Sequence, residues 1–151
     1  MLKYLKMGCF WLIDEKNVIR MRVPFPDIDS GLAARPHMYI CLKSGTQKEF
    51  IKCQTFKPRH LFRNKAPHNY LIEDPDIDRN PFYDKTTIDC DKSFGVENVT
   101  VDKSLITDKR EDVCDALFRG VKHKINHSNF VTNFLDIAPL LTINSKITSN
   151  Q

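Results

Sequence analysis

The stretch MRVPFPDIDSGLAARPHMYICL, residues 21–42, decides how the rest of the chain is interpreted. A strand expected at residues 18–23 ends at Pro24 and Pro26, because proline has no amide hydrogen to give to a sheet. Asp27, Asp29, Ser30 and Gly31 are turn formers. Arg35-Pro36 then leads into a strongly apolar strand at residues 37–43. The loop at 24–36 is long for a simple connection, which favours a functional role for it.

The composition is that of an ordinary globular protein. The 151 residues are 41% hydrophobic and 28% charged, which predicts one domain, residues 1–151, with a core that needs no metal or disulfide. The net charge of +4 is compatible with a nucleic-acid partner but does not require one.

The cysteines lack any zinc-ligand or redox spacing, so we expect small buried hydrophobes, a reducing cytoplasm and no cofactor. The apolar run at residues 7–13 is too short for a membrane span and has no small-residue cleavage site. We therefore expect neither a signal peptide nor a membrane partner. The five cysteines are Cys9, Cys41, Cys53, Cys90 and Cys114.

Apolar alternation predicts a series of short strands followed by a helix. The strands are expected at residues 9–13, 18–23, 37–43, 49–55, 69–72, 85–90 and 96–101. Apolar positions at helical spacing between Val113 and Ile125 predict an amphipathic helix of about five turns with Thr107 as its N-cap. A second short helix is expected at 128–137, stopped by Pro139, and the last dozen residues are expected to fray.

This order predicts a mainly β protein with α-helix, a small and strongly bent barrel with the helix across one side. Within the single domain, residues 1–16 form an extra N-terminal strand and residues 18–125 form the barrel with its main helix. Residues 126–151 are a C-terminal extension.

Charge is distributed unevenly along the chain. Residues 43–65 hold Lys or Arg at 43, 48, 52, 57, 59, 63 and 65 against the single acid Glu49, whereas residues 73–91 are acidic. The basic segment would follow a phosphate backbone, and Phe50, Phe56 and Phe62 would stack on bases. The alternative is a solvated face with three core phenylalanines. The RNA-binding candidates are Lys52, Lys57, Arg59, His60, Phe56 and Arg63.

Several short motifs resemble the MazF/PemK family of toxin endoribonucleases. The order strand, Phe25-Pro26, loop, Arg35-Pro36, strand is the family's opening. Cys53-Gln54-Thr55 resembles its strand-end threonine, and Asp91-Lys92 resembles its "CDQ" or "LDK" segment. Asp89 stands where some members carry an arginine. The resemblance spans roughly residues 18–125, with an insertion at 56–84.

The resemblance implies an SH3-like barrel of the MazF, Kid and CcdB type. It implies metal-independent cleavage of single-stranded mRNA at specific sequences, by attack of a 2′-hydroxyl, to a 2′,3′-cyclic phosphate and a 5′-hydroxyl. It further implies a homodimer and a cognate antitoxin that blocks the groove. The residues that carry catalysis in this reading are Arg35, Thr55, Asp91 and His37.

Each of these residues also has a purely structural interpretation. Arg35 would bind the scissile phosphate or cap a surface loop, and Thr55 would meet the phosphate or its own backbone. Asp89 and Asp91 share one strand face, where repulsion would raise one pKa, or are simply exposed.

The proton-transfer groups are left open between three histidines, His37, His60 and His68, each with a structural role as the alternative. The competing functional class is a CcdB-like toxin or an SH3-like module that acts by protein or RNA contact without catalysis. A third is a toxin of the ToxN kind, neutralised by RNA.

Overall fold

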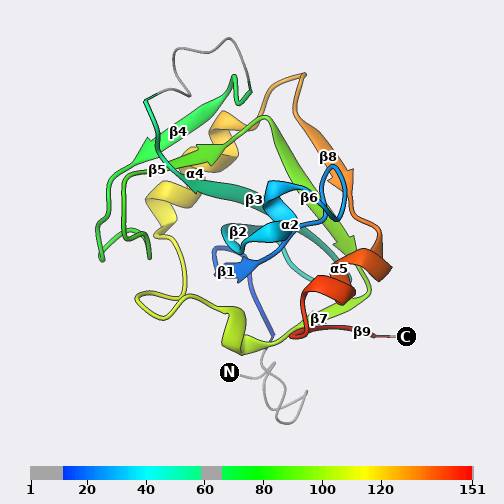
Figure 1. The fold of residues 1–151 in the computed structure, drawn as a ribbon. Helices are drawn as coiled ribbons and strands as arrows, with labels where there is room; N and C mark the ends of the chain where they lie inside the picture. The colour runs from blue at the N-terminus through cyan, green and yellow to red at the C-terminus, as the bar shows by residue number, and fades with distance from the viewer. Residues whose placement is uncertain (1–11, 59–65, 151) are drawn as a thin grey trace.

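The computed structural model describes residues 12–58 and 66–150, and in these ranges the chain is mainly β (Figure 1). The strands are β1 (Val18–Met21), β2 (His37–Lys43), β3 (Gln47–Thr55), β4 (Tyr70–Glu73), β5 (Thr86–Asp89), β6 (Lys92–Glu97), β7 (Val99–Val101), β8 (Val131–Phe134) and β9 (Ile147–Ser149). The helices are α2 (Gly31–Ala34), η1 (Lys103–Leu105), α4 (Asp115–Lys124) and α5 (Ile137–Ile143).

β3 is the central strand of a seven-stranded sheet. On one side it pairs with β2, which pairs with β1. On the other side its first half pairs with β6 and its last three residues pair with β5. β4 extends the sheet beyond β5, and β8 extends it beyond β6 in the one parallel pairing among the described strands. Among the described residues this ladder stays open, so the closed barrel that we expected is not formed there.

The two faces of the sheet bury two separate cores. In β2, Tyr39 and Cys41 belong to the first core, whereas Ile40 and Leu42 belong to the second, as the alternation of a strand requires. α5 and the small β7–β9 sheet cover the first core, and α4 covers the second (Figure 1). Each fully buried large apolar side chain stabilises the fold by roughly 1.5–3 kcal/mol.

Most of the expected strands are confirmed to within two residues, and one is divided. The strand expected at 96–101 is two strands, β6 and β7, because Asn98 between them has a φ of +57°. Its amide donates to the carbonyl of Thr46, so the chain turns there and β7 leaves the main sheet. The strand expected at 9–13 lies outside the described residues apart from Leu12 and Ile13, which are not in a strand.

The main helix is shorter than the sequence predicted. It begins at Asp115, where the Cys114 Sγ accepts the amide hydrogen of Leu117 at 3.4 Å. Thr107 is not its cap, because the Thr107 hydroxyl donates to backbone carbonyls at Val18 and Arg110. The segment that precedes α4 is held beside β1 by two isolated β-bridges, one from Ile106 to Ile19 and one from Asp112 to Asn17. Tertiary pairing therefore overrides the local helical pattern.

The C-terminal expectations were wrong in position. Residues 131–134 form β8 instead of helix, and the second short helix is α5. Pro139 falls in the first turn of α5, where the missing amide hydrogen has no helical partner to lose. The expected fraying is not seen at residues 147–149, since β9 pairs with β7 along its whole length.

Every helix within residues 12–58 and 66–150 is too short or too polar to cross a bilayer.

Candidate functional site

The loop after β1 folds back on the sheet and fixes the position of Arg35. The amide of Val23 donates to the carbonyl of Leu32 at 2.9 Å, and Leu32 packs against the first core. Ser30 caps the single turn of α2 by accepting the amide hydrogen of Ala33. Arg35 then returns to extended backbone and its side chain is exposed. The arginine is thus presented at the start of β2 by an ordered turn that sequence reasoning placed in a loop.

Alternation along β2 and β3 brings polar side chains to one end of the first-core face. Tyr39 pairs directly with Lys52, so both side chains lie on the same face, and two-residue steps add His37 and Gln54 to it. Tyr39 is fully buried, whereas His37, Lys52 and Gln54 are half-buried. The apolar face therefore ends in a polar patch beside Arg35.

A buried carboxylate holds two lysines in this patch. The Asp89 side chain is only 4% exposed, and its Oδ2 lies 3.7 Å from the Nζ atoms of both Lys52 and Lys92. Lys92 also lies over the ring of Phe25, 5.7 Å from the centroid. One negative charge therefore faces two positive charges, which leaves the patch cationic.

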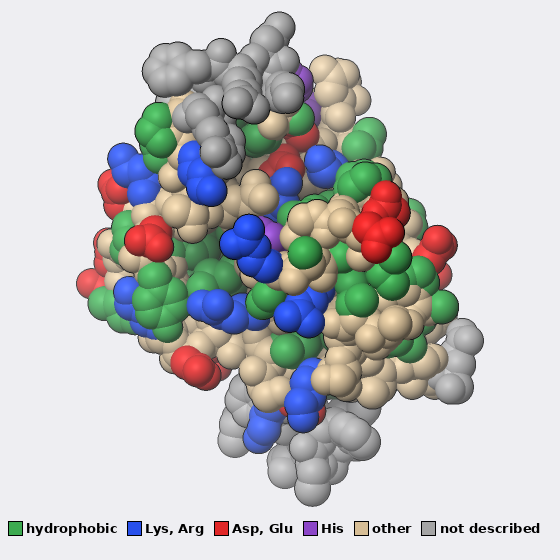
Figure 2. All heavy atoms as spheres, in the orientation of Figure 1, with side chains coloured by type: hydrophobic (Ala, Val, Ile, Leu, Met, Phe, Trp, Pro, Cys, Tyr) green, Lys and Arg blue, Asp and Glu red, His purple; other side chains and the backbone are tan. Residues whose placement is uncertain are grey.

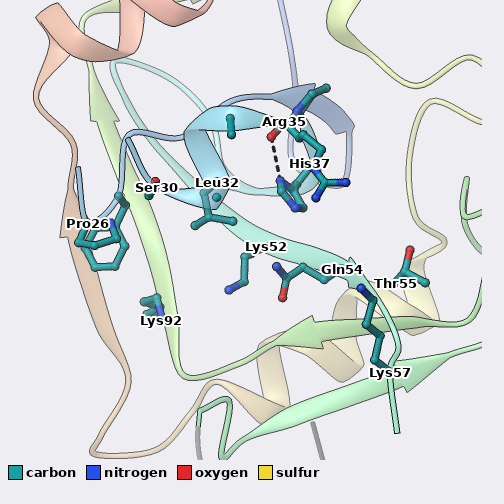
Figure 3. A pocket seen from close by; sticks show the side chains of 14 residues that line it. Pro26, Ser30, Leu32, Arg35, His37, Lys52, Gln54, Thr55, Lys57 and Lys92 are labelled. Carbon is teal, nitrogen blue, oxygen red and sulfur yellow. Dashed lines mark hydrogen bonds between the residues drawn. The ribbon is translucent and has the colours of Figure 1, made fainter. Parts of the chain in front are cut away.

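A cavity of about 840 Å³, a volume typical of ligand sites, is lined by His37, Lys52, Gln54 and Lys92, together with Arg35 (Figure 3). Its lining includes four cations and, among the described residues, no acid: Arg35, Lys52, Lys57 and Lys92. Figure 2 shows Lys and Arg side chains in a broken row across this side of the molecule. A hollow with this charge suits a phosphate-bearing ligand.

The ring of His37 has a defined tautomer in this arrangement. Its Nδ1 lies 3.0 Å from the carbonyl oxygen of Arg35 (Figure 3), and because a carbonyl only accepts, Nδ1 must carry the hydrogen. Burial lowers the pKa of His37, the bond to the carbonyl opposes that shift, and the charges of Lys52 and Arg35 lower it further. Near neutral pH the ring is uncharged, and Nε2 holds a free lone pair.

Lys52 is the most enclosed of the four cations. Burial lowers the pKa of its ammonium group, and the nearby Asp89 carboxylate acts in the opposite direction. Such a lysine releases a proton more readily than an exposed lysine does. The cavity therefore holds a candidate proton acceptor, His37, and a candidate proton donor, Lys52, on the same sheet face.

The structure brings together five of the residues that the sequence singled out. Arg35, His37, Lys52, Thr55 and Lys57 all line the cavity. Thr55, the last residue of β3, lies beyond Gln54 at one end (Figure 3).

Three other candidates from the basic segment are not brought into the cavity. Phe56 lies under the Lys85 ammonium, 5.6 Å from its ring centroid, and Phe50 is a core residue. His68 is exposed and does not line the cavity. Arg59, His60, Phe62 and Arg63 lie outside the described residues.

Asp91 does not line the cavity. Its carboxylate accepts the amide hydrogens of His68 and Asn69, at 2.7 and 2.9 Å, and a third hydrogen from the Asn69 side chain. Partial burial acts to raise the pKa of Asp91, but these hydrogen bonds lower it overall. The expected pair of repelling carboxylates is therefore absent: Asp89 binds lysines, and Asp91 fixes the start of β4.

We expect Asp91→Asn to lower stability by about 1–3 kcal/mol, because a neutral amide cannot accept the same three hydrogens with charge. RNA cleavage, if present, should change little. Asp78→Asn, at an exposed carboxylate, is the matched control.

Because the pKa of Asp91 is lowered in the folded state, the contribution of Asp91 to stability is full above about pH 4 and is lost as the pH falls further. Urea unfolding at several pH values would show a flatter acid dependence in the variant, and equal slopes would contradict this assignment.

Sequence reasoning missed Gln54 and Lys92 as site residues. Gln54 carried the signal of strand alternation, since it lies two residues after Lys52. Lys92 reaches the cavity only because β6 pairs with the first half of β3, and no local pattern predicts that pairing. Within the described residues, no group of three or more His, Cys, Asp or Glu side chains is arranged to hold a metal ion.

Comparison of the chain with protein-family models, curated proteins and solved structures found no match. The case for a function therefore rests on the geometry of the cavity and on the motifs within this chain.

Proposed function

We propose that the protein is a metal-independent endoribonuclease that cleaves single-stranded RNA, of the MazF/PemK toxin kind. The observation that carries the proposal is the position of the His37 ring, whose Nδ1 is held by the Arg35 carbonyl, in a cavity lined by four cations. A base beside a phosphate-binding cluster is what 2′-hydroxyl attack requires.

The reaction proceeds in one displacement. His37 Nε2 removes the proton of a ribose 2′-hydroxyl, and the oxygen attacks the adjacent phosphorus. Arg35 and Lys92 stabilise the extra negative charge on the phosphoryl oxygens. The bond from phosphorus to the 5′-oxygen then breaks, and this oxygen takes a proton from Lys52. The products are a 2′,3′-cyclic phosphate and a 5′-hydroxyl end.

The toxin context is part of the same proposal. A basic cavity open on one side would accept an acidic segment of a cognate antitoxin in place of RNA, and the family resemblance adds a homodimer. The cavity favours this proposal over a non-catalytic binder, because a contact surface does not need a histidine held in one tautomer.

The deciding experiment is RNA cleavage by purified protein in EDTA, with Arg35→Ala beside wild type. We expect Arg35→Ala to lower the rate by about 10²–10³-fold, the loss typical of one group that stabilises transition-state charge. Arg119→Ala, an exposed arginine on α4 on the opposite side of the sheet, removes the same charge and should leave the rate within about twofold.

The ends of the fragments should be mapped as well. Cyclic phosphate at a short defined sequence in wild type supports the proposal. Intact RNA at high protein concentration would refute catalysis and favour the binding class. Equal cleavage by both variants and wild type would assign the activity to other residues or to a contaminant.

A further inference from the structure

A second depression, of about 240 Å³, adjoins the candidate site. Four residues line both hollows: Pro36, His37, Gln54 and Thr55. His37 therefore lies at their junction. A chain-like ligand with its reacting atoms at His37 would extend into the second depression on one side.

The second depression presents an exposed aromatic ring. Tyr83 lines it and is 60% exposed. Two cations lie over the ring in cation–π contact, the Arg20 guanidinium at 5.8 Å and the Lys109 ammonium at 5.0 Å from the centroid. The side chain of Arg20 lines the same depression and makes no hydrogen bond or ion pair with the described residues.

The backbone that carries Tyr83 is firmly held. The preceding Phe82 is buried in the second core, and its amide donates to the buried Asn80 side chain at 3.0 Å. Lys109 donates to the Phe82 carbonyl at 3.1 Å. Asn80 itself donates to Glu73 and to the carbonyl of Asp74. An exposed ring on an ordered support loses little conformational entropy when a base displaces one of these cations and stacks on it.

The charges of the two depressions differ in a way that separates phosphate from base. Among the described residues, the charged residues that line the first are all cations, whereas the second is lined by Arg20 and also by Asp84, the residue after Tyr83. A carboxylate repels phosphate but accepts hydrogens from the edge of a nucleobase. Stacking on an aromatic ring holds an unpaired base of any sequence.

We propose that the second depression binds an unpaired nucleobase adjacent to the scissile phosphate, stacked on Tyr83, with Arg20 on the next phosphate. This inference rests on the proposed function, since it states which part of the RNA substrate the second depression binds. It makes single-stranded RNA the substrate class, because a paired base is stacked within its own helix and cannot reach the ring.

Binding can be tested without cleavage. The probe is a short fluorescein-labelled RNA of random sequence with 2′-O-methyl groups throughout, which has no attacking hydroxyl. We expect Tyr83→Ala to weaken binding by about 5- to 150-fold, and Tyr83→Phe to remain within about twofold because the ring is retained. The salt dependence should be unchanged in Tyr83→Ala and shallower in Arg20→Ala, because of these two residues only Arg20 contacts phosphate.

The outcomes separate this inference from the proposed function. Tyr83-dependent binding by a protein that cleaves no RNA supports the base subsite and refutes the nuclease. Cleavage with equal binding by wild type and Tyr83→Ala overturns the subsite and leaves the nuclease standing. Weakening by Tyr83→Phe as large as that by Tyr83→Ala also overturns stacking, since the hydroxyl alone would then matter. Circular dichroism of each variant checks that the exposed substitution leaves the fold intact.

Discussion

Replacing His37 by Asn should lower the rate of RNA cleavage by about 10²–10⁴-fold, the usual contribution of a general base. The asparagine amide is still able to donate to the Arg35 carbonyl, so the local backbone is expected to hold. The lone pair of Nε2, however, is lost. Binding of the uncleavable RNA probe should change little, which places the effect on the chemical step. His123→Asn, at an exposed position near the end of α4, is the matched control and should cleave as wild type does.

The pH dependence of wild type gives an independent check on His37. Since its pKa is lowered from 6.5, the ring becomes neutral, and active as a base, as the pH rises through a value below 6.5. The rate should therefore rise on the acid side and reach its plateau before neutral pH. A rate that falls between about pH 5 and pH 7 would contradict a basic role for His37.

Replacing Asp89 by Asn should destabilise the protein by about 2–4 kcal/mol, near the range for removing one partner of a buried ion pair. The carboxylate is almost fully buried, and its loss removes the negative charge that lies 3.7 Å from both Lys52 and Lys92. The amide of Asp91 also donates to Asp89 at 2.8 Å. Thermal unfolding should show a midpoint lower by about 5–15 °C for a chain of this size.

Two comparisons isolate the buried charge as the cause. Asp115→Asn breaks a shorter ion pair, 2.7 Å to Lys16, but Asp115 is 70% exposed, so water screens the pair and its loss should change the stability little. Adding Lys52→Met to Asp89→Asn should restore part of the stability, because one unpaired charge is then replaced by an apolar chain. If Asp89→Asn is no less stable than Asp115→Asn, the paired lysines do not depend on Asp89.

The strands were predictable wherever one short stretch of chain contained the whole signal. β2 and β3 combine apolar alternation with a turn at 44–46 that includes Gly45 at a φ of +102°, and their positions were found. The start of α4 was not predictable from local sequence. Residues 106–112 lie along β1 because of contacts such as the hydrogen bond from Thr107 to Val18, which are nearly ninety positions apart in the chain. β8 and β9 were not predicted for the same reason, since each strand depends on a partner that is distant in the sequence.

The same distinction between local and long-range signals separates the site residues that could be predicted from those that could not. Arg35 and His37 come from one motif, and Lys52 and Lys57 from one basic segment, so sequence reasoning reached them. Asp91 looked equally suitable, but the sequence could not show that its carboxylate turns toward the start of β4. The second depression was not foreseen, since it combines Arg20 of β1 with Tyr83 from the acidic loop.

The change of partner along β3 has a consequence for how this chain tolerates variation. Phe50 pairs with β6 and Cys53 pairs with β5, so the sheet forks beside Lys52, and Asp89 and Lys92 stand on the two branches. The distances between Lys52, Asp89 and Lys92 are set by the two hydrogen-bond ladders of β3 and not by side-chain packing around the cavity. Substitutions that keep both registers can therefore remodel the cavity wall freely, whereas a one-residue slip in either branch would separate Lys52 from its neighbours without altering any residue that a ligand touches.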